Sequence, residues 1–213
     1  MRPEPFRVAV LVSGAGTNLQ ALIDRVHLAP QPVAEIALVV CSRAGAPALD
    51  RARSAGIPTA VVSLSDHPDR TARDRALADV VARADPGLVV MAGWMSIVGA
   101  AFLDRFPDRV INLHPSLLPS FPGMHAIQEA LDWGVRVTGV TVHLAEEAVD
   151  AGPPVLQEAV PVTHADTHET LRDRIREVEH RLLTQAVTLY AAGRVHRDPE
   201  RPRQVVITDP GGS

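Results

Sequence analysis

The sequence predicts an α/β protein, a single Rossmann-like domain in which helices flank a mainly parallel sheet. Short β-branched runs alternate with amphipathic stretches, which distinguishes a layered α/β fold from a helical bundle or a β-sandwich. The strand-then-helix order repeats four times, which indicates parallel strands joined by right-handed crossovers. With 213 residues, 46% of them hydrophobic, the chain can bury one sizeable core. We expect functional residues at strand ends and in the loops that follow, where ligands bind in such sheets.

The first half of the chain alternates strands and helices. Residues 8–12 are predicted to form a buried apolar strand and the glycine-rich segment 13–18 a turn, and residues 19–27 carry apolar side chains at helical spacing. The same patterns predict further strands at 36–41, 59–62 and 88–91, and further helices at 45–56 and 70–83.

The second half contains a longer loop and one long helix. A short helical segment around Phe102 precedes a strand at 109–113, which stops at His114-Pro115 because proline cannot continue a ladder. The proline-rich stretch 114–124 is expected to be a loop. Beyond it the patterns predict a helix at 126–131, strands at 135–144 and 155–160, and an amphipathic helix at 167–192. The predicted domain covers residues 1–195, and residues 196–213 are expected to form a polar, flexible tail.

Composition limits the chemistry of the site. All 21 residues in the Lys+Arg total are Arg, so Schiff-base chemistry and a lysine-bearing phosphate loop are excluded. The lone Cys41 cannot form an intramolecular disulfide or hold an iron–sulfur cluster, and a buried apolar role is its simplest interpretation. We expect no metal site, because His164 and His168 lack a third ligand in a recognised pattern. One unpaired cysteine suits a reducing cytoplasm, which is the expected location.

Charge and hydropathy favour small-molecule partners. The formal net charge of -4 and the pI near 6.1 argue against a nucleic-acid surface, and only 3% of the residues are aromatic. No apolar run approaches 18 residues, and no apolar leader precedes the first strand. The sequence therefore predicts neither nucleic-acid binding nor a membrane span.

The glycine-rich segment from Ser13 to Asn18 ends the first strand and opens a helix. Free backbone N–H groups at such a place can bind an anion, and a monophosphate fits. The segment is not a Walker A sequence, and it is not GxGxxG because Leu19 occupies the position of the third glycine. A tight turn with Thr17 as the helix N-cap is the alternative interpretation.

Asn112 and His114 lie two residues apart at the end of an apolar strand, so their side chains share one face. Asn can donate to a developing oxyanion, and His can donate or carry a proton near neutral pH. Together they suit acyl transfer through a tetrahedral intermediate. The alternative is a histidine that caps loop carbonyls at the strand end.

The acidic loop at 146–150 supplies candidate carboxylates. Asp150 could orient or charge His114, as in a His–Asp pair, although acidic loop residues are commonly just solvated. The spacing alone leaves both interpretations open. His143 is interpreted as a packed, hydrogen-bonded strand residue, and Glu179 as a solvent-facing position of the long helix.

Four motifs in order resemble the folate-dependent formyltransferases. They are Ser13-Gly-Ala-Gly-Thr-Asn-Leu-Gln20, Ala92-Gly-Trp-Met95, Asn112-Leu-His-Pro-Ser-Leu-Leu-Pro119 and Asp150-Ala-Gly-Pro153. The third motif is typical of the whole family, and the first favours its glycinamide ribonucleotide branch. The resemblance covers roughly residues 7–195 and implies the formyltransferase fold for that domain.

The resemblance implies a purine-biosynthesis reaction, in which 10-formyltetrahydrofolate is the cosubstrate and its formyl group passes to the amine of glycinamide ribonucleotide. It implies that Asn112, His114 and Asp150 are catalytic. It further implies that glycinamide ribonucleotide binds Gly16, Thr17, Asn18 and Glu179. The folate would contact Arg70, Met95, Ser96, Ile97, Val98 and Asn112. A monomer or homodimer with no metal is expected.

Ser96 departs from the family pattern, which often has Arg at that position. An arginine contact to the folate is therefore lost there, whereas backbone contacts from the same segment depend only on the chain path. Of the alternatives, the formyltransferase for initiator methionyl-tRNA and the formyltetrahydrofolate hydrolase usually carry an extra domain, which we do not expect in this chain. A noncatalytic nucleotide-binding module would leave Asn112, His114 and Asp150 without a role.

Overall fold

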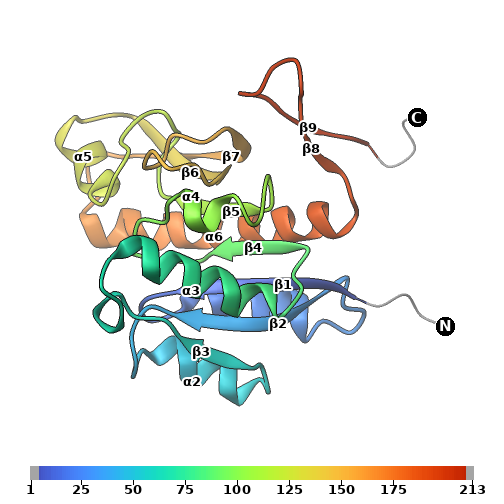
Figure 1. Cartoon of the computed structure of the whole chain (residues 1–213). Coiled ribbons are helices and arrows are strands. Elements are labelled where there is room, and N and C mark those ends of the chain that lie inside the picture. Colours follow the sequence, from blue (N-terminus) through green and yellow to red (C-terminus); the bar gives the residue numbers. More distant parts are fainter. Residues whose placement is uncertain (1–4, 210–213) are drawn as a thin grey trace.

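A seven-stranded sheet forms the centre of the molecule. The computed structural model describes residues 5–209, so residues 1–4 and 210–213 of the predicted domain and tail lie outside the described part. The strands are β1 (Phe6–Val12), β2 (Ala34–Cys41), β3 (Thr59–Val61), β4 (Leu88–Met91), β5 (Val110–His114), β6 (Val137–Leu144) and β7 (Pro154–Pro161). Their order in the sheet is β3-β2-β1-β4-β5-β6-β7. Figure 1 shows the strands side by side in this order.

The sheet is parallel from β3 to β5 and antiparallel from β5 to β7. The predicted class, a mainly parallel sheet flanked by helices, is therefore confirmed. The strand order reverses direction between β1 and β4, which creates a crevice at the carboxyl ends of these strands. The loops that follow β1 and β4 open into this crevice, which is where ligands bind in open α/β sheets.

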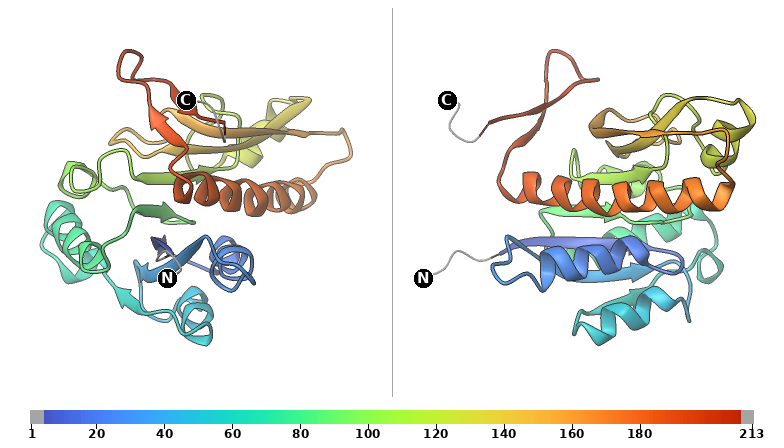
Figure 2. Two further views of the ribbon diagram at one scale, coloured as in Figure 1. Left: turned by 90° about the vertical axis from the view of Figure 1, so that its right-hand side faces the viewer. Right: turned by 180° about the vertical axis from the view of Figure 1, so that it is seen from behind.

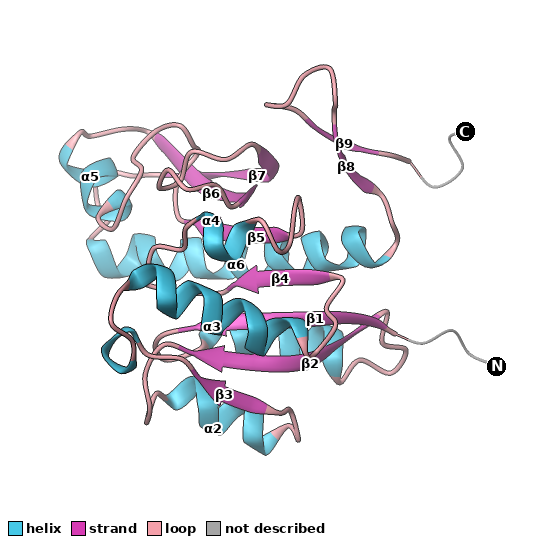
Figure 3. Ribbon diagram, in the orientation of Figure 1, coloured by secondary structure: helices cyan, strands magenta, loops and turns pink. Residues whose placement is uncertain are grey.

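Helices cover both faces of the sheet (Figures 2 and 3). One face carries α1 (Thr17–Leu22), α2 (Pro47–Ser54) and α6 (His168–Ala191), and the other carries α3 (Arg70–Ala82) and α4 (Ala100–Leu103). The remaining helical elements are the π-helical turn η1 (Ile23–His27), the 3-10 turn η2 (Leu64–Asp66) and α5 (Ala126–Asp132). The predicted helix at 19–27 begins two residues earlier than expected and changes to a π turn at Ile23.

The long helix α6 supplies much of the core on its face of the sheet. Its buried apolar residues recur every three or four positions, with adjacent pairs at 182–183 and 186–187, so they form one stripe that packs against the sheet. The helix begins at a capping box, in which the Thr167 hydroxyl accepts the Thr170 amide and the Thr170 hydroxyl accepts the Thr167 amide. The predicted helix at 167–192 is therefore confirmed. The capping box fixes the residue at which the helix that carries Glu179 begins.

The C-terminal segment differs from the expected flexible tail. Strands β8 (Val195–Arg197) and β9 (Val205–Ile207) pair in an antiparallel hairpin. Arg197 bonds to Glu146 at 2.7 Å and to Asp108 at 3.1 Å, and Arg203 Nη1 donates to the Ala151 carbonyl at 2.6 Å. The polar composition predicts a solvated tail, but in the structure Arg197 and Arg203 of this segment donate to acceptors in the 146–151 loop. Among the described residues, no helix is long and apolar enough to span a membrane.

We expect Leu183→Ala in α6 to destabilise the protein by about 3 kcal/mol, because it removes a fully buried side chain and leaves a cavity. Urea unfolding followed by circular dichroism should show a lower midpoint with an unchanged slope. Leu28→Ala, at a position 58% exposed, is the control and should change the midpoint little. Equal shifts for the two variants would contradict the assigned packing of α6.

Candidate active site

A cavity of about 500 Å³ lies at the carboxyl ends of β1, β4 and β5. It receives residues from the loop after β4, from the end of β5 and from the loop after β6. Most of the predicted site residues line it, namely Asn18, Met95, Ser96, Ile97, Val98, Asn112, His114, Asp150 and Glu179. Segments that are separated by up to 161 positions therefore meet in one cavity.

Asn112 and His114 occupy one face of β5, as their spacing predicts, and β6 adds a third polar residue to that face. Asn112 pairs directly with His143 across the antiparallel β5–β6 ladder. The Asn112 Nδ2 lies 3.2 Å from His143 Nε2 and donates to it, because His143 Nδ1 donates its proton to the Leu144 carbonyl at 2.8 Å. His143 is therefore a site residue whose imidazole orients the Asn112 amide.

The Asp150 carboxylate connects the polar residues of the cavity. Its Oδ2 lies 3.2 Å from His114 Nδ1 and accepts the Gly123 amide at 2.8 Å, and its Oδ1 accepts Asn112 Nδ2 at 3.3 Å. Reversing the Asn112 amide would turn its oxygen toward this carboxylate, so the donor orientation is the favourable one. Asp150 is therefore a buried partner of His114, and the solvated alternative is wrong.

Both ring nitrogens of His114 face acceptors. Nδ1 faces the Asp150 carboxylate, and Nε2 lies 2.7 Å from the Phe121 carbonyl. Neither partner can donate, so an imidazolium with two N–H groups satisfies both contacts. The geometry therefore suits a His114 that donates from both ring nitrogens, one of them toward the Asp150 carboxylate.

The environment of Asp150 favours its ionised form. Burial raises the pKa of Asp150, but the Gly123 amide and the neighbouring His114 hold it below the ordinary value of 3.8. His143 Nε2 is 3.6 Å from Asp150 Oδ1, a longer approach than that of Asn112. At neutral pH the carboxylate is therefore ionised and available as an acceptor for His114 Nδ1.

The turn that carries Asp150 depends on a close backbone approach. Gly152 lies so near β6 that a Cβ atom there would meet the Leu144 carbonyl oxygen at 1.8 Å. Asp150 itself has φ 51, in the left-handed region that Asp tolerates better than most residues. Packing therefore explains the glycine of the Asp-Ala-Gly-Pro motif, because only glycine fits where the loop passes over β6.

Glu179 and Asn18 form the opposite end of the cavity. Asn18 Nδ2 donates to Glu179 Oε2 at 3.3 Å, and Asn18 Oδ1 is buried with no partner among the described residues. Burial raises the pKa of Glu179 above its ordinary value of 4.5, against the opposing effects of Asn18 and Arg176. The solvent-facing interpretation of Glu179 is wrong, because its carboxylate lines the cavity.

The glycine-rich turn is shaped by its contact with α2. Gly16 has φ 73 and caps α1 with its backbone, so the alternative that Thr17 is the N-cap is wrong. A Cβ atom on Gly16 would lie 2.7 Å from Ala48 Cβ. Arg51 Nε donates to the Ala15 carbonyl at 2.8 Å. The path of the turn is therefore fixed from α2.

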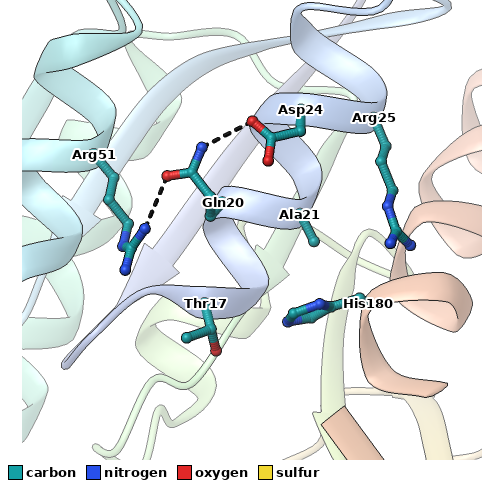
Figure 4. A pocket seen from close by; sticks show the side chains of 7 residues that line it. All are labelled: Thr17, Gln20, Ala21, Asp24, Arg25, Arg51 and His180. Atoms are coloured by element: carbon teal, nitrogen blue, oxygen red, sulfur yellow. Dashed lines mark hydrogen bonds between the residues drawn. The ribbon is translucent and has the colours of Figure 1, made fainter. Parts of the chain in front are cut away.

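A second hollow of about 220 Å³ adjoins this turn (Figure 4). Thr17 lies at one end of it, and Arg51 and Arg25 flank it on opposite sides. Arg51 also donates to Gln20 Oε1 at 3.0 Å, and Gln20 donates to Asp24 at 2.8 Å. The hollow holds no part of the Asn112–His114–Asp150 group.

The loop after β4 forms the apolar wall of the cavity. Met95 and Ile97 are 61% and 49% exposed, which is unusual for large apolar side chains unless they face a ligand or partner. Arg70 is exposed at the start of α3 and does not line the cavity. Within residues 5–209, no three His, Cys, Asp or Glu side chains are grouped as a metal site requires.

The fold and the site together define a class of protein. A family model described as formyl transferase matches residues 6–187, and the chain belongs to this family. It is 44% identical over 187 residues to phosphoribosylglycinamide formyltransferase from Mycobacterium tuberculosis, a match covering 88% of this chain and 86% of that protein.

A solved structure supports the same relationship. The glycinamide ribonucleotide transformylase 1 from Symbiobacterium toebii superposes with a TM-score of 0.89 at 43% identity, covering 98% of this chain and 96% of that one. The chain is also 45% identical over 195 residues to the trifunctional purine biosynthetic protein adenosine-3 of Bos taurus. The match covers 92% of this chain but only 19% of that longer protein.

The two carboxyl groups of the cavity should give opposite pH dependences of stability. The folded pKa of Asp150 is lowered, so its ionised form stabilises the fold above about pH 4, and this contribution is lost as pH falls through the folded pKa. The folded pKa of Glu179 is raised, so its contribution is lost as pH rises above about 4.5.

Urea unfolding between pH 3 and 7 would measure both effects as differences from wild type. The wild-type advantage over Asp150→Asn should grow with pH, and that over Glu179→Gln should shrink. Glu147→Gln, at an exposed position of the same acidic loop, is the control. Slopes of the same sign for the two buried sites would contradict the assigned environments.

Proposed function

We propose that this chain transfers the formyl group of 10-formyltetrahydrofolate to the amine of glycinamide ribonucleotide. The products are N-formylglycinamide ribonucleotide and tetrahydrofolate, a step of purine biosynthesis. One observation carries the proposal: Asn112, His114 and Asp150 meet in one cavity between an apolar wall and the glycine-rich turn. The names of the relatives in M. tuberculosis and S. toebii support the choice of substrates.

In the proposed reaction, the neutral amine of glycinamide ribonucleotide attacks the formyl carbon. The carbonyl bond opens to an oxyanion, which Asn112 and the His114 imidazolium stabilise. Asp150 keeps His114 charged and takes the amine proton, directly or through water. The C–N bond to the folate then breaks as the folate nitrogen is protonated and leaves.

The present hydrogen bonds must rearrange before an oxyanion can be bound. The Asn112 amide donates to His143 and Asp150, and His114 Nε2 donates to the Phe121 carbonyl. An oxyanion would therefore displace one partner of each residue. The Phe121 carbonyl is the partner most readily exchanged, because it lies in the proline-rich loop and not in the sheet. Asp150 would remain with His114 throughout.

The two substrates would occupy opposite ends of the cavity. The folate ring would lie on the wall of Met95, Ser96, Ile97 and Val98 near Asn112, with its tail directed toward Arg70. The phosphate of glycinamide ribonucleotide would bind the backbone at Gly16, Thr17 and Asn18, and Glu179 would accept the ribose hydroxyls. The amine would then reach the formyl group near His114.

The remaining features of the proposal concern partners and location. Both substrates are small molecules, and the reaction needs no metal, nucleic acid or membrane. A cytoplasmic monomer or homodimer is the simplest form of such an enzyme. The net charge of -4 is unfavourable for binding tRNA, which disfavours the methionyl-tRNA formyltransferase alternative.

A direct assay would compare formyl transfer from 10-formyltetrahydrofolate to three acceptors. We expect transfer to glycinamide ribonucleotide and none to methionyl-tRNA, with hydrolysis by water much slower. Production of tetrahydrofolate with each acceptor is the measurement. No transfer to glycinamide ribonucleotide would defeat the proposal, and hydrolysis alone would favour the hydrolase.

We expect Asn112→Ala to lower kcat about a hundredfold, because losing one oxyanion donor costs on the order of 3 kcal/mol. The measurement is steady-state turnover at saturating concentrations of both substrates, with circular dichroism to check the fold. Gln128→Ala, at an exposed position on α5, is the control. Turnover near the wild-type value would remove Asn112 from the proposed mechanism.

We expect Arg51→Gln to raise the KM for glycinamide ribonucleotide about fivefold, because it removes the hydrogen bond that holds the Ala15 carbonyl. The effect should disappear with a substrate analogue that lacks the phosphate. Arg53→Gln on the same helix is the control, since Arg53 is exposed and pairs only with Asp50 among the described residues. An equal effect on the analogue would mean that Arg51 does not act through the phosphate-binding turn.

A further inference from the structure

Helix α3 contains a buried ion pair that the proposed mechanism does not use. Arg73 and Asp74 are each 1% exposed, and Arg73 is among the largest fully buried side chains of the protein. Arg73 Nε donates to Asp74 Oδ1 at 2.8 Å. Removing two charges from water is costly, and an apolar pair of similar volume is often at least as stable in such a place. The pair therefore needs an explanation other than filling the core.

Both members of the pair also bind the backbone of the cavity wall. Arg73 Nη2 donates to the Ile97 carbonyl at 2.6 Å, and Asp74 Oδ2 accepts the Gly99 amide at 2.8 Å. The Arg73 guanidinium lies over the Trp94 ring at 5.6 Å. Three contacts thus connect the ion pair to the segment 94–99, whose members Met95 to Val98 line the cavity.

The other backbone hydrogen bonds of this part of the chain lie at its two ends, at Ala92 and Gly93 toward β1 and at Gly99 toward α4. Residues 92–99 form neither helix nor strand, so no regular ladder sets their path. At the start of the segment the Met95 amide donates to Ser13 Oγ at 2.9 Å, which attaches it to the end of β1. The ion pair supplies the corresponding attachment at the other end. The wall of the cavity is therefore held between β1 and α3.

Arg73 does not have a complete set of partners. Its Nη1 is buried and has no hydrogen-bond partner among the described residues, which lowers the stability that the pair can contribute. Ser96 has no charge with which to bind the folate, so recognition by this segment depends on where its backbone lies. A residue pair that fixes this backbone would therefore affect the affinity for the cosubstrate more than the stability of the fold.

We propose that Arg73 and Asp74 are positioning residues for the formyl-folate cosubstrate, acting through the backbone of residues 94–99. The proposal rests on the proposed function for the identity of that cosubstrate. Neither residue touches the reacting atoms, so substituting them should lower the affinity for the folate and leave the rate of the chemical step unchanged. The second substrate binds at the glycine-rich turn, on the other side of the cavity, and should not respond.

The test is the double variant Arg73→Met, Asp74→Asn. The asparagine keeps an acceptor for the Gly99 amide, and the methionine fills the arginine volume without a buried charge. We expect the KM for 10-formyltetrahydrofolate to rise about tenfold, as expected for loss of a charged hydrogen bond. The KM for glycinamide ribonucleotide and the kcat at saturating folate should change less than twofold. Arg73→Lys, which keeps the charge and a donor, should lie between wild type and the double variant.

Arg105→Gln is the matched control, because Arg105, which follows α4, forms an exposed ion pair at 3.1 Å with Asp79 of α3. It should leave both KM values unchanged. An unchanged KM for the folate in the double variant overturns the proposal. An equal rise in both KM values overturns it too, and so does failure of the double variant to fold, since the pair would then serve the fold as a whole.

Equilibrium binding of tetrahydrofolate separates this proposal from the proposed function. If the wild-type protein binds tetrahydrofolate but does not formylate glycinamide ribonucleotide, the proposed function fails. The positioning role still predicts about tenfold weaker tetrahydrofolate binding by the double variant. If the wild type is active and the double variant binds tetrahydrofolate as tightly, the positioning role fails alone.

Discussion

The carboxylate of Asp150 connects its own turn to β5 and to the proline-rich loop that follows β5. His114 and Asn112 approach it from β5, and the Gly123 amide approaches it from the proline-rich loop. The carboxylate is held there by its backbone turn, in which Gly152 passes so close to β6 that no side chain fits. The charge on Asp150, the orientation of Asn112 and the hydrogen bonds of His114 therefore depend on one another. A shift of this turn would disturb all of them together.

The sheet explains why the cavity has two different ends. Parallel strands β1 and β4 send their following loops in opposite directions, so the glycine-rich turn and the apolar wall diverge from neighbouring strands. The antiparallel strand β6 then brings His143 opposite Asn112, beside the bottom of the crevice. A polar end suited to an anion and an apolar end suited to a flat ring thus follow from the strand order, with the reactive group between them.

The sequence predicted the sheet class and most of the elements, because burial and turn residues mark them locally. It also placed Asn112 and His114 on one face, since strand geometry alone requires this. The prediction that His143 is packed and hydrogen-bonded is confirmed. Its contact with Asn112 was missed, because the partner of Asn112 is set by the register between β5 and β6, which no local pattern contains. The burial of Glu179 and of Arg73 could not be predicted for a related reason. Whether a polar residue of an amphipathic helix meets solvent or another element is decided by tertiary packing.

The C-terminal hairpin of β8 and β9 supports the loop that carries Asp150, so the part of the chain that the site requires extends beyond the family match. The family match stops at residue 187, before β8 begins. A chain shortened to that limit would lose Arg197 and Arg203, and with them the partners of Glu146 and of the Ala151 carbonyl. Both contacts lie on the loop that presents Asp150. The minimal unit for expression or fusion should therefore extend through β9, although its last strands carry none of the motifs of the family.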